Sequence, residues 1–530
     1  MKKTRKESTI TTEPVRRLSP WRVSLAILIV AGLISGCIFA AQNWQVLTNQ
    51  NGPTAPWFAS YVDVTATPTF AFEQLGTTKN RDVILSFVVA RNASTCEPTW
   101  GTAYTMDQAR GALDLDRRIA RLRQQGSNIA ISFGGQRNDE LAVACKDTNE
   151  LEAAYRAVIQ RYQINTIDLD IEGDGLNNSE ANNRRATAVA ALQKDMRAQG
   201  NSLAVWATLP VAPTGLSEAG TDTVSILLSK GVDLAGVNAM TMDYGQSLPA
   251  GSTMASASQS ALIQTHRQLG ILYKKVNIQL SDRALWAKIG ATPMIGQNDI
   301  SNEIFTMNDA KDLNSFAQSQ GIGRMSMWSA NRDLTCGSNY INLQVVSSSC
   351  SGIDQQGKTF AEYLSSGFTG SMTKSAYKVT TTDPKASAKP TPDDPNTSPY
   401  QIWSDTGAYL EGTKVVWHHN VYKAKWWTQG DLPDSPVLQS WQTPWELIGP
   451  VLPGEKPIPQ ATLPAGTYAE WSGDASYNTG DRVLFNGVPY QAKWWNKGQS
   501  PAASTSNPTS SPWAPFTEAQ LEQVQKQLQK

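Results

Sequence analysis

Histidine is scarce in this 530-residue chain, which contains only His266, His418 and His419. A histidine-based catalytic triad or a histidine-rich zinc site therefore has almost no raw material. An excess of charge of one sign is also lacking, because 46 lysines and arginines balance 46 aspartates and glutamates. Nucleic-acid binding favours a basic surface. No basic patch follows the first 22 residues, so we expect no nucleic-acid partner.

Cysteine is nearly as scarce, with five residues in the chain. Four of them follow the N-terminal region, and an exported chain can keep an even number of cysteines as disulfides. Cys336 and Cys350 flank a short loop and are expected to pair with each other. Cys96 and Cys145 then form the second pair by elimination. Four unpaired buried thiols are the alternative.

One long uncharged apolar run is present, at residues 23–41, behind a basic segment. Its length suits a bilayer span, and the preceding lysines and arginines predict that the rest of the chain is exported. A retained anchor is favoured over a signal peptide because both the basic lead and the apolar run are long. The "ISGC" ending at Cys37 resembles a bacterial lipoprotein cleavage box, so lipidation or simple cleavage are the alternatives. We expect an extracellular or envelope-anchored monomer that touches a membrane only through this segment.

Apolar strand-like runs alternate with longer helical patterns from Trp57 to about Gly367. Eight such runs lie at 57–65, 82–90, 128–135, 165–172, 202–210, 234–242, 275–281 and 323–330. Eight strands alternating with helices predict an α/β fold, a (β/α)8 TIM barrel. A doubly wound sheet is the competitor, but its Gly-rich phosphate turn is absent.

The amino-acid composition of the chain changes after Gly367. A Pro- and Thr-rich segment precedes two similar tryptophan-rich blocks, and a shift of 68 positions aligns the blocks without a gap. Both blocks contain "AKWW" and "PW". The predicted domains are a basic segment with an anchor at 1–45, a catalytic barrel at 55–370, a linker at 371–400, module 1 at 401–448, a linker at 449–468, module 2 at 469–516 and a polar tail at 517–530. The modules are expected to be small and all-β.

The run "INTIDLDIEG" carries three acids, Asp168, Asp170 and Glu172, at every second position. In a strand these acids share one face, and the intervening Ile and Leu share the other. Because barrel active sites lie at the C-terminal ends of the strands, Glu172 is placed at the reactive rim. Neighbouring acids and partial burial raise a carboxyl pKa, so the outermost group can act as a general acid. Binding of a hard cation and a solvated edge strand are the two alternatives. We predict neither a metal nor a cofactor.

The strand "DLDIE" looks like the D-x-D-x-E strand of family 18 glycoside hydrolases, the chitinases and their relatives. "SFGG" (132–135), "MTMDYG" (240–245) and "MSMW" (325–328) resemble the family motifs of strands three, six and eight. The chain departs from the commoner pattern at Asn165, Thr166 and Ile171. In the sixth-strand motif Asp243 precedes Tyr244, which leaves open which of the two takes each usual role.

The resemblance implies retaining hydrolysis in which the substrate's own N-acetyl group is the nucleophile, the substrate-assisted exception among glycosidases. It implies that Glu172 is the acid, that Asp170 orients the acetamide, and that Asp168 supports Asp170. It also implies that Tyr244 donates to the acetamide oxygen and that Asp243 helps to hold the sugar. Trp328 would stack under the sugar, and Met240 is counted with the sugar-binding residues. Barrel packing is the plain alternative for Tyr244 and Trp328. Ser132, Gly134 and Gly135 are expected to support the acid strand rather than touch substrate.

Ten of the 17 tryptophans lie from Trp403 onward. Blocks of about 45 residues cannot bury so many indoles, although Trp403, Trp445, Trp471 and Trp513 suit a core. The blocks resemble chitin- and cellulose-binding modules of families 5 and 12. This resemblance implies polymer contacts by one tryptophan of each pair and by the upstream tyrosines, namely Trp426, Trp427, Trp494, Trp495, Tyr422 and Tyr490. We therefore predict a chitinase whose partner is chitin or another N-acetylglucosamine polymer. An endo-β-N-acetylglucosaminidase acting on glycoprotein or peptidoglycan, or a chitin-binding protein without activity, are the alternatives.

Overall fold

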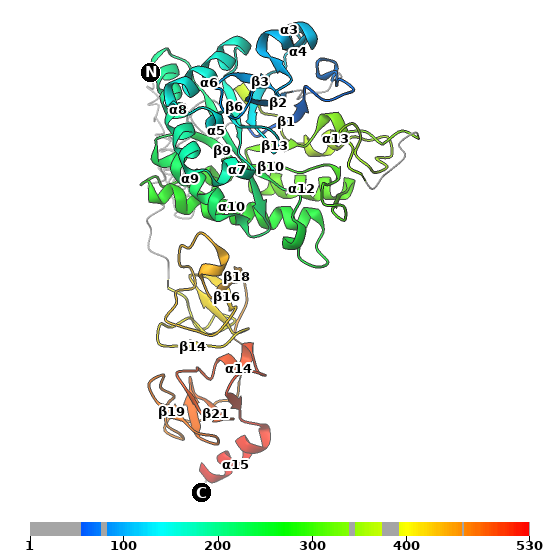
Figure 1. The fold of residues 1–530 in the computed structure, drawn as a ribbon. Coiled ribbons are helices and arrows are strands. Elements are labelled where there is room, and N and C mark those ends of the chain that lie inside the picture. Colours follow the sequence, from blue (N-terminus) through cyan, green and yellow to red (C-terminus); the bar gives the residue numbers. More distant parts are fainter. Residues whose placement is uncertain (1–54, 76–81, 339–344, 374–391, 458–459, 529–530) are drawn as a thin grey trace, which may run out of the picture. The chain divides into compact units, whose positions relative to one another are not determined.

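The computed structural model describes residues 55–75, 82–338, 345–373, 392–457 and 460–528 (Figure 1). The expected anchor segment, Cys37 and most of the first linker lie outside the described residues. Within the described ranges, no helix is long and apolar enough to span a bilayer.

Eight parallel strands close into a barrel in residues 57–327, and the predicted TIM barrel is confirmed (Figure 1). Strand β13 lies beside β1, and β1 also pairs with β2, so no edge is left open. The remaining neighbours follow chain order around the ring. The barrel strands are β1 (Trp57–Asp63), β2 (Val83–Ala90), β5 (Ile129–Gly134), β6 (Thr166–Asp170), β7 (Ala204–Ala212), β9 (Leu234–Met240), β10 (Ile289–Thr292) and β13 (Arg324–Met327).

Helices follow most of these strands and cover the outside of the barrel (Figure 1). Their ends match local sequence signals. The Asp147 side chain accepts hydrogen bonds from two backbone N–H groups of the first turn of α6, and Gly200, with φ +77°, lies just beyond the end of α8. The helices are α3 (Met106–Ala112), α4 (Leu115–Gln124), α5 (Leu141–Ala144), α6 (Thr148–Tyr162), α7 (Gly173–Asn177), α8 (Ser179–Ala198), α9 (Glu218–Ser229), α10 (Met254–Lys275), α11 (Asp282–Trp286), α12 (Met307–Gln320) and α13 (Phe360–Leu364).

One of the eight predicted strands is wrong. Residues 275–281 are not a strand, because α10 continues to Lys275 and the chain turns at Asn277, where φ is +60°. The seventh barrel strand is β10, which has only four residues, Ile-Gly-Ala-Thr. Its small side chains give no apolar run. Close packing explains Gly290, since a Cβ there would lie 2.8 Å from Asn238 Oδ1 of β9.

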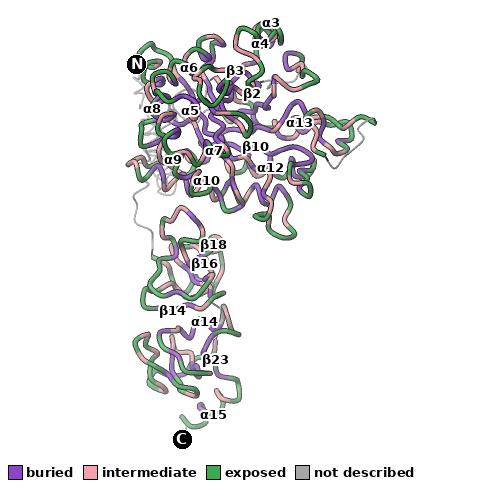
Figure 2. The backbone as a smooth tube through the Cα atoms, in the orientation of Figure 1, coloured by how far each residue is buried: buried purple, intermediate pink, exposed green. Residues whose placement is uncertain are grey.

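Short additional strands extend the sheet. Strands β3 (Pro98–Trp100) and β4 (Tyr104–Thr105) continue antiparallel from β2, and β8 (Gly215–Leu216) pairs with β7. Strands β11 (Gly296–Gln297) and β12 (Ile304–Phe305) form a separate two-stranded sheet. The main apolar core lies between the barrel strands and the helices, where buried backbone dominates the tube in Figure 2. A second apolar cluster includes Trp57, Tyr61 and Trp206.

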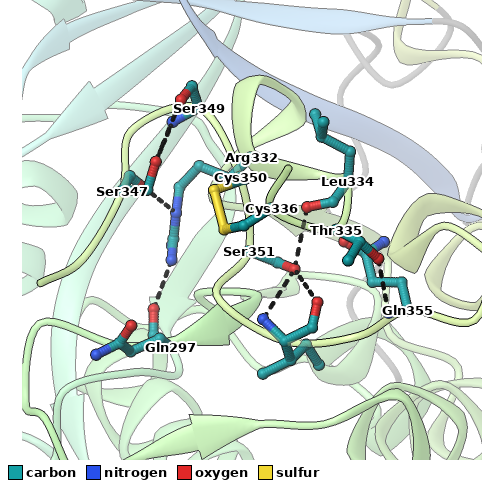
Figure 3. The surroundings of a disulfide bond; sticks show 11 residues. Gln297, Arg332, Leu334, Thr335, Cys336, Ser347, Ser349, Cys350, Ser351 and Gln355 are labelled. Carbon is teal, nitrogen blue, oxygen red and sulfur yellow. Dashed lines mark hydrogen bonds between the residues drawn. A yellow bond between two sulfur atoms is a disulfide. The ribbon is translucent and has the colours of Figure 1, made fainter. Parts of the chain in front are cut away.

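Both expected disulfides are present, Cys96–Cys145 and Cys336–Cys350. Figure 3 shows the second one beside Arg332. The Arg332 Nε donates to the carbonyl of Ser347, and its Nη2 donates to the carbonyl of Gln297 in β11. Arg332 therefore ties the disulfide loop to the loop that begins at β11.

The two C-terminal blocks repeat each other in structure as in sequence. In module 1 the strands are β14 (Ala408–Tyr409), β15 (Lys414–Trp417), β16 (Asn420–Ala424), β17 (Thr428–Gln429) and β18 (Trp445–Pro450). In module 2 they are β19 (Ser476–Tyr477), β20 (Arg482–Phe485), β21 (Val488–Ala492), β22 (Asn496–Lys497) and β23 (Trp513–Pro515). Each strand of module 2 begins 68 positions after its counterpart. The small all-β architecture is confirmed.

The polar tail forms a helix, α15 (Glu518–Leu528). Val524 is buried in a small cluster with Leu463, Leu484 and Phe516, and Leu521 packs against this cluster. The tail therefore extends the core of module 2.

Candidate active site

The acid strand β6 lies between β5 and β7 and has the expected alternation. Ile167, Leu169 and Ile171 are buried in the core beneath the helices. Asp168 is aligned with Ser132 of β5, and Asp170 is aligned with Gly134. The acids therefore point into the barrel, as the period of two predicts.

Asp168 is enclosed by hydrogen-bond donors from four other strands. Its Oδ2 accepts from the hydroxyls of Tyr61 and Ser132, both at 2.8 Å. Its Oδ1 accepts from Thr208 Oγ1 at 2.7 Å and from Arg324 Nη1 at 2.6 Å. Both oxygens of Asp168 are therefore saturated with hydrogen bonds, one of them from the guanidinium of Arg324. The expected supporting role of Ser132 agrees with this contact.

Arg324 is the buried cation of the lumen, and the sequence reasoning missed it. Its guanidinium carbon lies 5.3 Å from the ring centroids of Trp57 and Trp206, and its Nη2 donates to Tyr61 Oη at 2.8 Å. A signal was available, because Arg324 and Ser326 alternate with Met325 and Met327 in β13. A charged residue on the inward face of a barrel strand needs a counter-charge, and Asp168 supplies it.

Asp170 lies one step nearer the rim than Asp168 and is also buried. Burial raises the pKa of its carboxyl well above the ordinary value, with the charges of Glu172 and Asp168 adding to the rise and Arg324 opposing it. Its Oδ1 is buried and has no hydrogen-bond partner among the described residues. Asp170 therefore has one oxygen free to bond a ligand.

Two glycines of the SFGG segment allow this close packing. A Cβ at Gly134 would lie 2.0 Å from the Asp170 carbonyl oxygen, and one at Gly135 would lie 3.0 Å from the Phe87 ring. Gly135 also donates its backbone N–H to the Asp170 carbonyl at 3.0 Å. This agrees with the expectation that these small residues support the acid strand.

Glu172 stands at the C-terminal rim, immediately before α7. Burial raises the pKa of its carboxyl to about 7, and the negative charges of Asp243 and Asp299 add to the rise. A carboxyl with this pKa is largely protonated in mildly acidic solution, as a general acid requires. The sequence predicted a raised pKa from partial burial and from the acids of the same strand, and burial is the largest cause. The structure shows that two acids from other loops, Asp243 and Asp299, also raise this pKa. Asp299 was not predicted because it lies in no recognisable sequence motif.

The loop after β9 is held by its own network of hydrogen bonds. Asp243 has φ +50°, and its Oδ1 accepts the Ile300 N–H at 3.1 Å. Glu303, which is fully buried, accepts the N–H groups of Tyr244 and Gly245 at 2.9 and 2.5 Å. The loop that carries Asp299 is thereby tied to Asp243, close enough for both charges to act on Glu172.

The structure does not bring Tyr244 to the acids. Its hydroxyl donates to Ser258 Oγ of α10 at 3.1 Å, and its ring belongs to the core beneath the helices. The implied contact of Tyr244 with an acetamide is therefore corrected. Inversion of the motif order turns the aspartate toward Glu172 and the tyrosine away from it.

Aromatic side chains line the C-terminal end of the barrel next to the acids. Trp328, which follows β13, is half-buried and stacks on Phe87 with ring centroids 5.3 Å apart. It also meets Tyr61, the partner of Asp168, edge to face at 6.1 Å. Met240, at the end of β9, is also half-buried. These positions are compatible with the predicted sugar contacts.

The hard-cation alternative fits this arrangement poorly. Both oxygens of Asp168 are occupied by four donors, so Asp168 has no lone pair directed at a metal. A calcium or magnesium site would need several such carboxylate oxygens free. The described residues contain no group of three or more His, Cys, Asp or Glu side chains arranged to hold a metal ion.

Each module exposes both indoles of its AKWW segment. Trp426 and Trp427 are 44% and 53% exposed, and Trp494 and Trp495 are 42% and 61% exposed. The expectation that one tryptophan of each pair faces outward is corrected, because both do. Tyr422 and Tyr490 are buried in the module cores, so their expected polymer contacts are corrected as well. Trp445 and Trp513 are buried as predicted, and Trp403 and Trp471 pack against the same cores.

Known proteins resemble both parts of the chain. Residues 470–514 match the model of carbohydrate-binding module family 5/12. The probable bifunctional chitinase/lysozyme of Escherichia coli is 34% identical over 316 residues, which is 56% of this chain and 34% of that protein. Endochitinase 11 of Metarhizium anisopliae is 33% identical over 311 residues, which is 55% of this chain and 57% of that protein. The chain thus spans about a third and somewhat more than half of these relatives.

A solved structure resembles the barrel. The catalytic domain of the hyperthermophilic chitinase from Pyrococcus furiosus is 26% identical to this chain, with a TM-score of 0.49. The similarity covers 60% of this chain and 96% of that domain.

Proposed function

We propose that the chain is a chitinase that hydrolyses β-1,4 bonds between N-acetylglucosamine units with retention of configuration. The observation that carries the proposal is the row of three carboxyl groups on one strand face, each in a different environment. Asp168 is paired with Arg324, burial raises the pKa of Asp170, and burial raises the pKa of Glu172 to about 7. The names of the two curated relatives, a chitinase/lysozyme and an endochitinase, support the substrate class.

In the first step Glu172 gives its proton to the glycosidic oxygen while the bond from that oxygen to the anomeric carbon breaks. The carbonyl oxygen of the substrate's acetamide forms a new bond to the anomeric carbon, which gives an oxazolinium ion. Positive charge then spreads onto the acetamide nitrogen. Asp170, one position inward from Glu172, accepts a hydrogen bond from the acetamide N–H through its free Oδ1 and so orients the acetamide for attack.

In the second step the Glu172 carboxylate removes a proton from water as the water oxygen attacks the anomeric carbon. The bond to the acetamide oxygen breaks, the acetamide is restored, and Glu172 is protonated again. Two displacements leave the configuration retained. Asp168 and Arg324 act only through Asp170, because their own charges are satisfied by each other and by surrounding hydroxyls.

Replacement of the acid tests the proposal. Glu172→Gln should lower the turnover of a chitin oligomer at least about 1,000-fold, since a general acid supplies about 10²–10⁴ in rate and here also serves as the base. Binding of insoluble chitin should be unchanged. Glu150→Gln, on the exposed first turn of α6, is the matched control and should keep full activity. Turnover retained by Glu172→Gln would overturn the mechanism.

Peptidoglycan is the second candidate substrate, because the relative in Escherichia coli is named as a chitinase and a lysozyme. An endo-β-N-acetylglucosaminidase would use the same acids. Product analysis on colloidal chitin, peptidoglycan and glycoprotein separates these substrates. Release of N-acetylglucosamine oligomers from chitin, without cleavage of the others, is the expected result.

Both C-terminal modules are proposed to bind the polymer. Module 2 matches the family 5/12 model over residues 470–514, and module 1 has the same strand register and the same pair of exposed tryptophans. Two linked sites increase the effective concentration at an insoluble surface. Truncation after residue 373 should lose binding to chitin and spare hydrolysis of short soluble oligomers. Equal loss of both activities would contradict this division of labour.

We also propose that the chain is exported and acts outside the cytoplasm as a monomer. The two disulfides support an oxidising compartment. Fractionation of cells that express the full chain, with protease applied from outside, tests the location.

A further inference from the structure

Module 1 exposes one tryptophan that module 2 lacks. Trp441, in the short 3-10 helix Ser440–Gln442, is 56% exposed, more than either member of the neighbouring Trp426 and Trp427 pair. The shift of 68 places the exposed Thr509 at this position in module 2. An indole of this size left in water is costly unless it has a partner.

A lysine holds the segment of Trp441 against the AKWW segment. The Lys425 N–H donates to the Pro444 carbonyl at 2.7 Å, and the Lys425 Nζ donates to the Ser440 carbonyl. The same Nζ lies 4.8 Å from the ring centroid of Trp426. The backbone that carries Trp441 is therefore fixed beside the first indole of the pair.

Module 2 contains the same brace without the third indole. The Lys493 N–H donates to the Pro512 carbonyl at 2.6 Å, its Nζ donates to the Pro508 carbonyl at 3.1 Å, and its Nζ lies 4.6 Å from the Trp494 ring. Each of these partners is 68 positions from its counterpart. The two modules therefore share this lysine brace. The braced segment carries an exposed tryptophan, Trp441, in module 1 and a threonine, Thr509, in module 2.

We propose that Trp441, with Trp426 and Trp427, forms a three-indole surface that makes module 1 the tighter binder of the N-acetylglucosamine polymer. This inference rests on the proposed polymer binding of the modules. The apolar C–H face of a pyranose ring suits an exposed indole, which loses little conformational freedom when it is covered. The adjacent Lys425 and the carbonyls of the braced segment add polar groups for sugar hydroxyls. Module 2, with two exposed indoles, is the shorter site.

The test uses the full chain with one module silenced at a time, in the inactive Glu172→Gln background. With Trp494→Ala and Trp495→Ala present, Trp441→Thr should weaken binding to insoluble chitin by about tenfold, as expected for loss of a central aromatic contact. Trp441→Tyr should keep most of the affinity, because it keeps a flat ring. With Trp426→Ala and Trp427→Ala present, Thr509→Trp should increase the affinity of module 2 several-fold.

The outcomes separate this inference from the proposed function. If the unmodified modules bind chitin and Trp441→Thr binds equally well, only the role of Trp441 is overturned. If the unmodified chain does not bind chitin, polymer binding fails and this inference fails with it. A change in sedimentation on Trp441→Thr, with chitin binding intact, would overturn the inference in favour of a contact with a second copy of the chain.

Discussion

In the barrel, Trp57 and Trp206 are buried around the guanidinium of Arg324, whereas each C-terminal module exposes both tryptophans of its AKWW segment. Size explains much of the difference. A domain of about 300 residues encloses enough volume to shield an ion pair, while a block of about 45 residues has a core of only a few side chains. The barrel therefore uses aromatic rings to surround a buried charge, whereas the modules present them to solvent.

The largest effect on the difference between barrel and modules is expected from replacing Arg324, the arginine buried between Trp57 and Trp206. Arg324→Met should lower the free energy of unfolding of the barrel by about 3–5 kcal/mol, because Asp168 would remain buried without a counter-charge. Calorimetry of the full chain should show the barrel transition shifted and the module transitions unchanged. Arg117→Met is the control, since the Arg117–Asp114 pair is on the surface and its loss should cost less than about 1 kcal/mol. An unshifted barrel transition would mean that the hydroxyls around Asp168 suffice.

Within module 1, a buried and an exposed tryptophan should behave in opposite ways. Trp445 is buried, donates its Nε1–H to the Asp431 carbonyl at 2.8 Å and packs on Tyr409. Trp445→Ala should therefore cost about 3–5 kcal/mol and unfold the module. Trp427→Ala should change stability by less than about 0.5 kcal/mol while weakening chitin binding. Circular dichroism and chitin sedimentation measure the two effects, and similar losses of stability would contradict the division into core and surface.

Ionisation of Glu172, the proposed general acid, should lower the free energy of unfolding of the barrel as the pH rises. The folded-state pKa of Glu172, about 7, lies above its ordinary value. The protonated carboxyl therefore contributes its full stability to the folded barrel below the ordinary pKa, and this contribution is lost as the pH rises through about 7. Glu172→Gln, which cannot ionise, should be more stable than the wild type at pH 8, by about 3 kcal/mol, and equally stable at pH 4. Thermal unfolding at both pH values checks this. Equal Tm values at pH 8 would place the ionised Glu172 in water.

The smallest expected effect concerns an acid outside the strand. Asp299 adds to the rise in the pKa of Glu172, so Asp299→Asn should move the alkaline limb of kcat/KM toward lower pH. Activity at pH 8 should fall roughly twofold, and activity at pH 5 should stay unchanged. Asp282→Asn, an exposed acid at the start of α11, is the matched control. A limb that moves equally in both variants would indicate a general charge effect instead.

Much of the site could be predicted because its signal is local. The alternation of acids with Ile and Leu in β6 places Asp168, Asp170 and Glu172 on one face whatever the rest of the chain does. The repeat of AKWW likewise predicts two modules of one design. Strand β10 escaped prediction because four small residues carry no periodic pattern, and their role depends on close contact with β9.

Long-range contacts account for the other corrections. Tyr244 and Asp243 are neighbours in the chain, but their side chains have different partners. The Tyr244 hydroxyl donates to Ser258 in the core, whereas the Asp243 carboxylate accepts the Ile300 N–H from the loop after β11. Tyr422 and Tyr490 carry the same side chain as a ligand-binding tyrosine, and only the packing of the module core shows that they are buried. Residue type alone did not distinguish these positions.

By itself the amino-acid sequence determined seven of the eight barrel strands, the shared face of the three acids and the repeat of the modules, because each follows from spacing along the chain. Only the tertiary structure decided the partners of those acids. Arg324 lies 156 residues from Asp168 and Asp299 lies 127 residues from Glu172 in the sequence. Closure of the barrel brings the first pair into contact and the second pair within electrostatic range, where the charge of Asp299 adds to the rise in the pKa of Glu172.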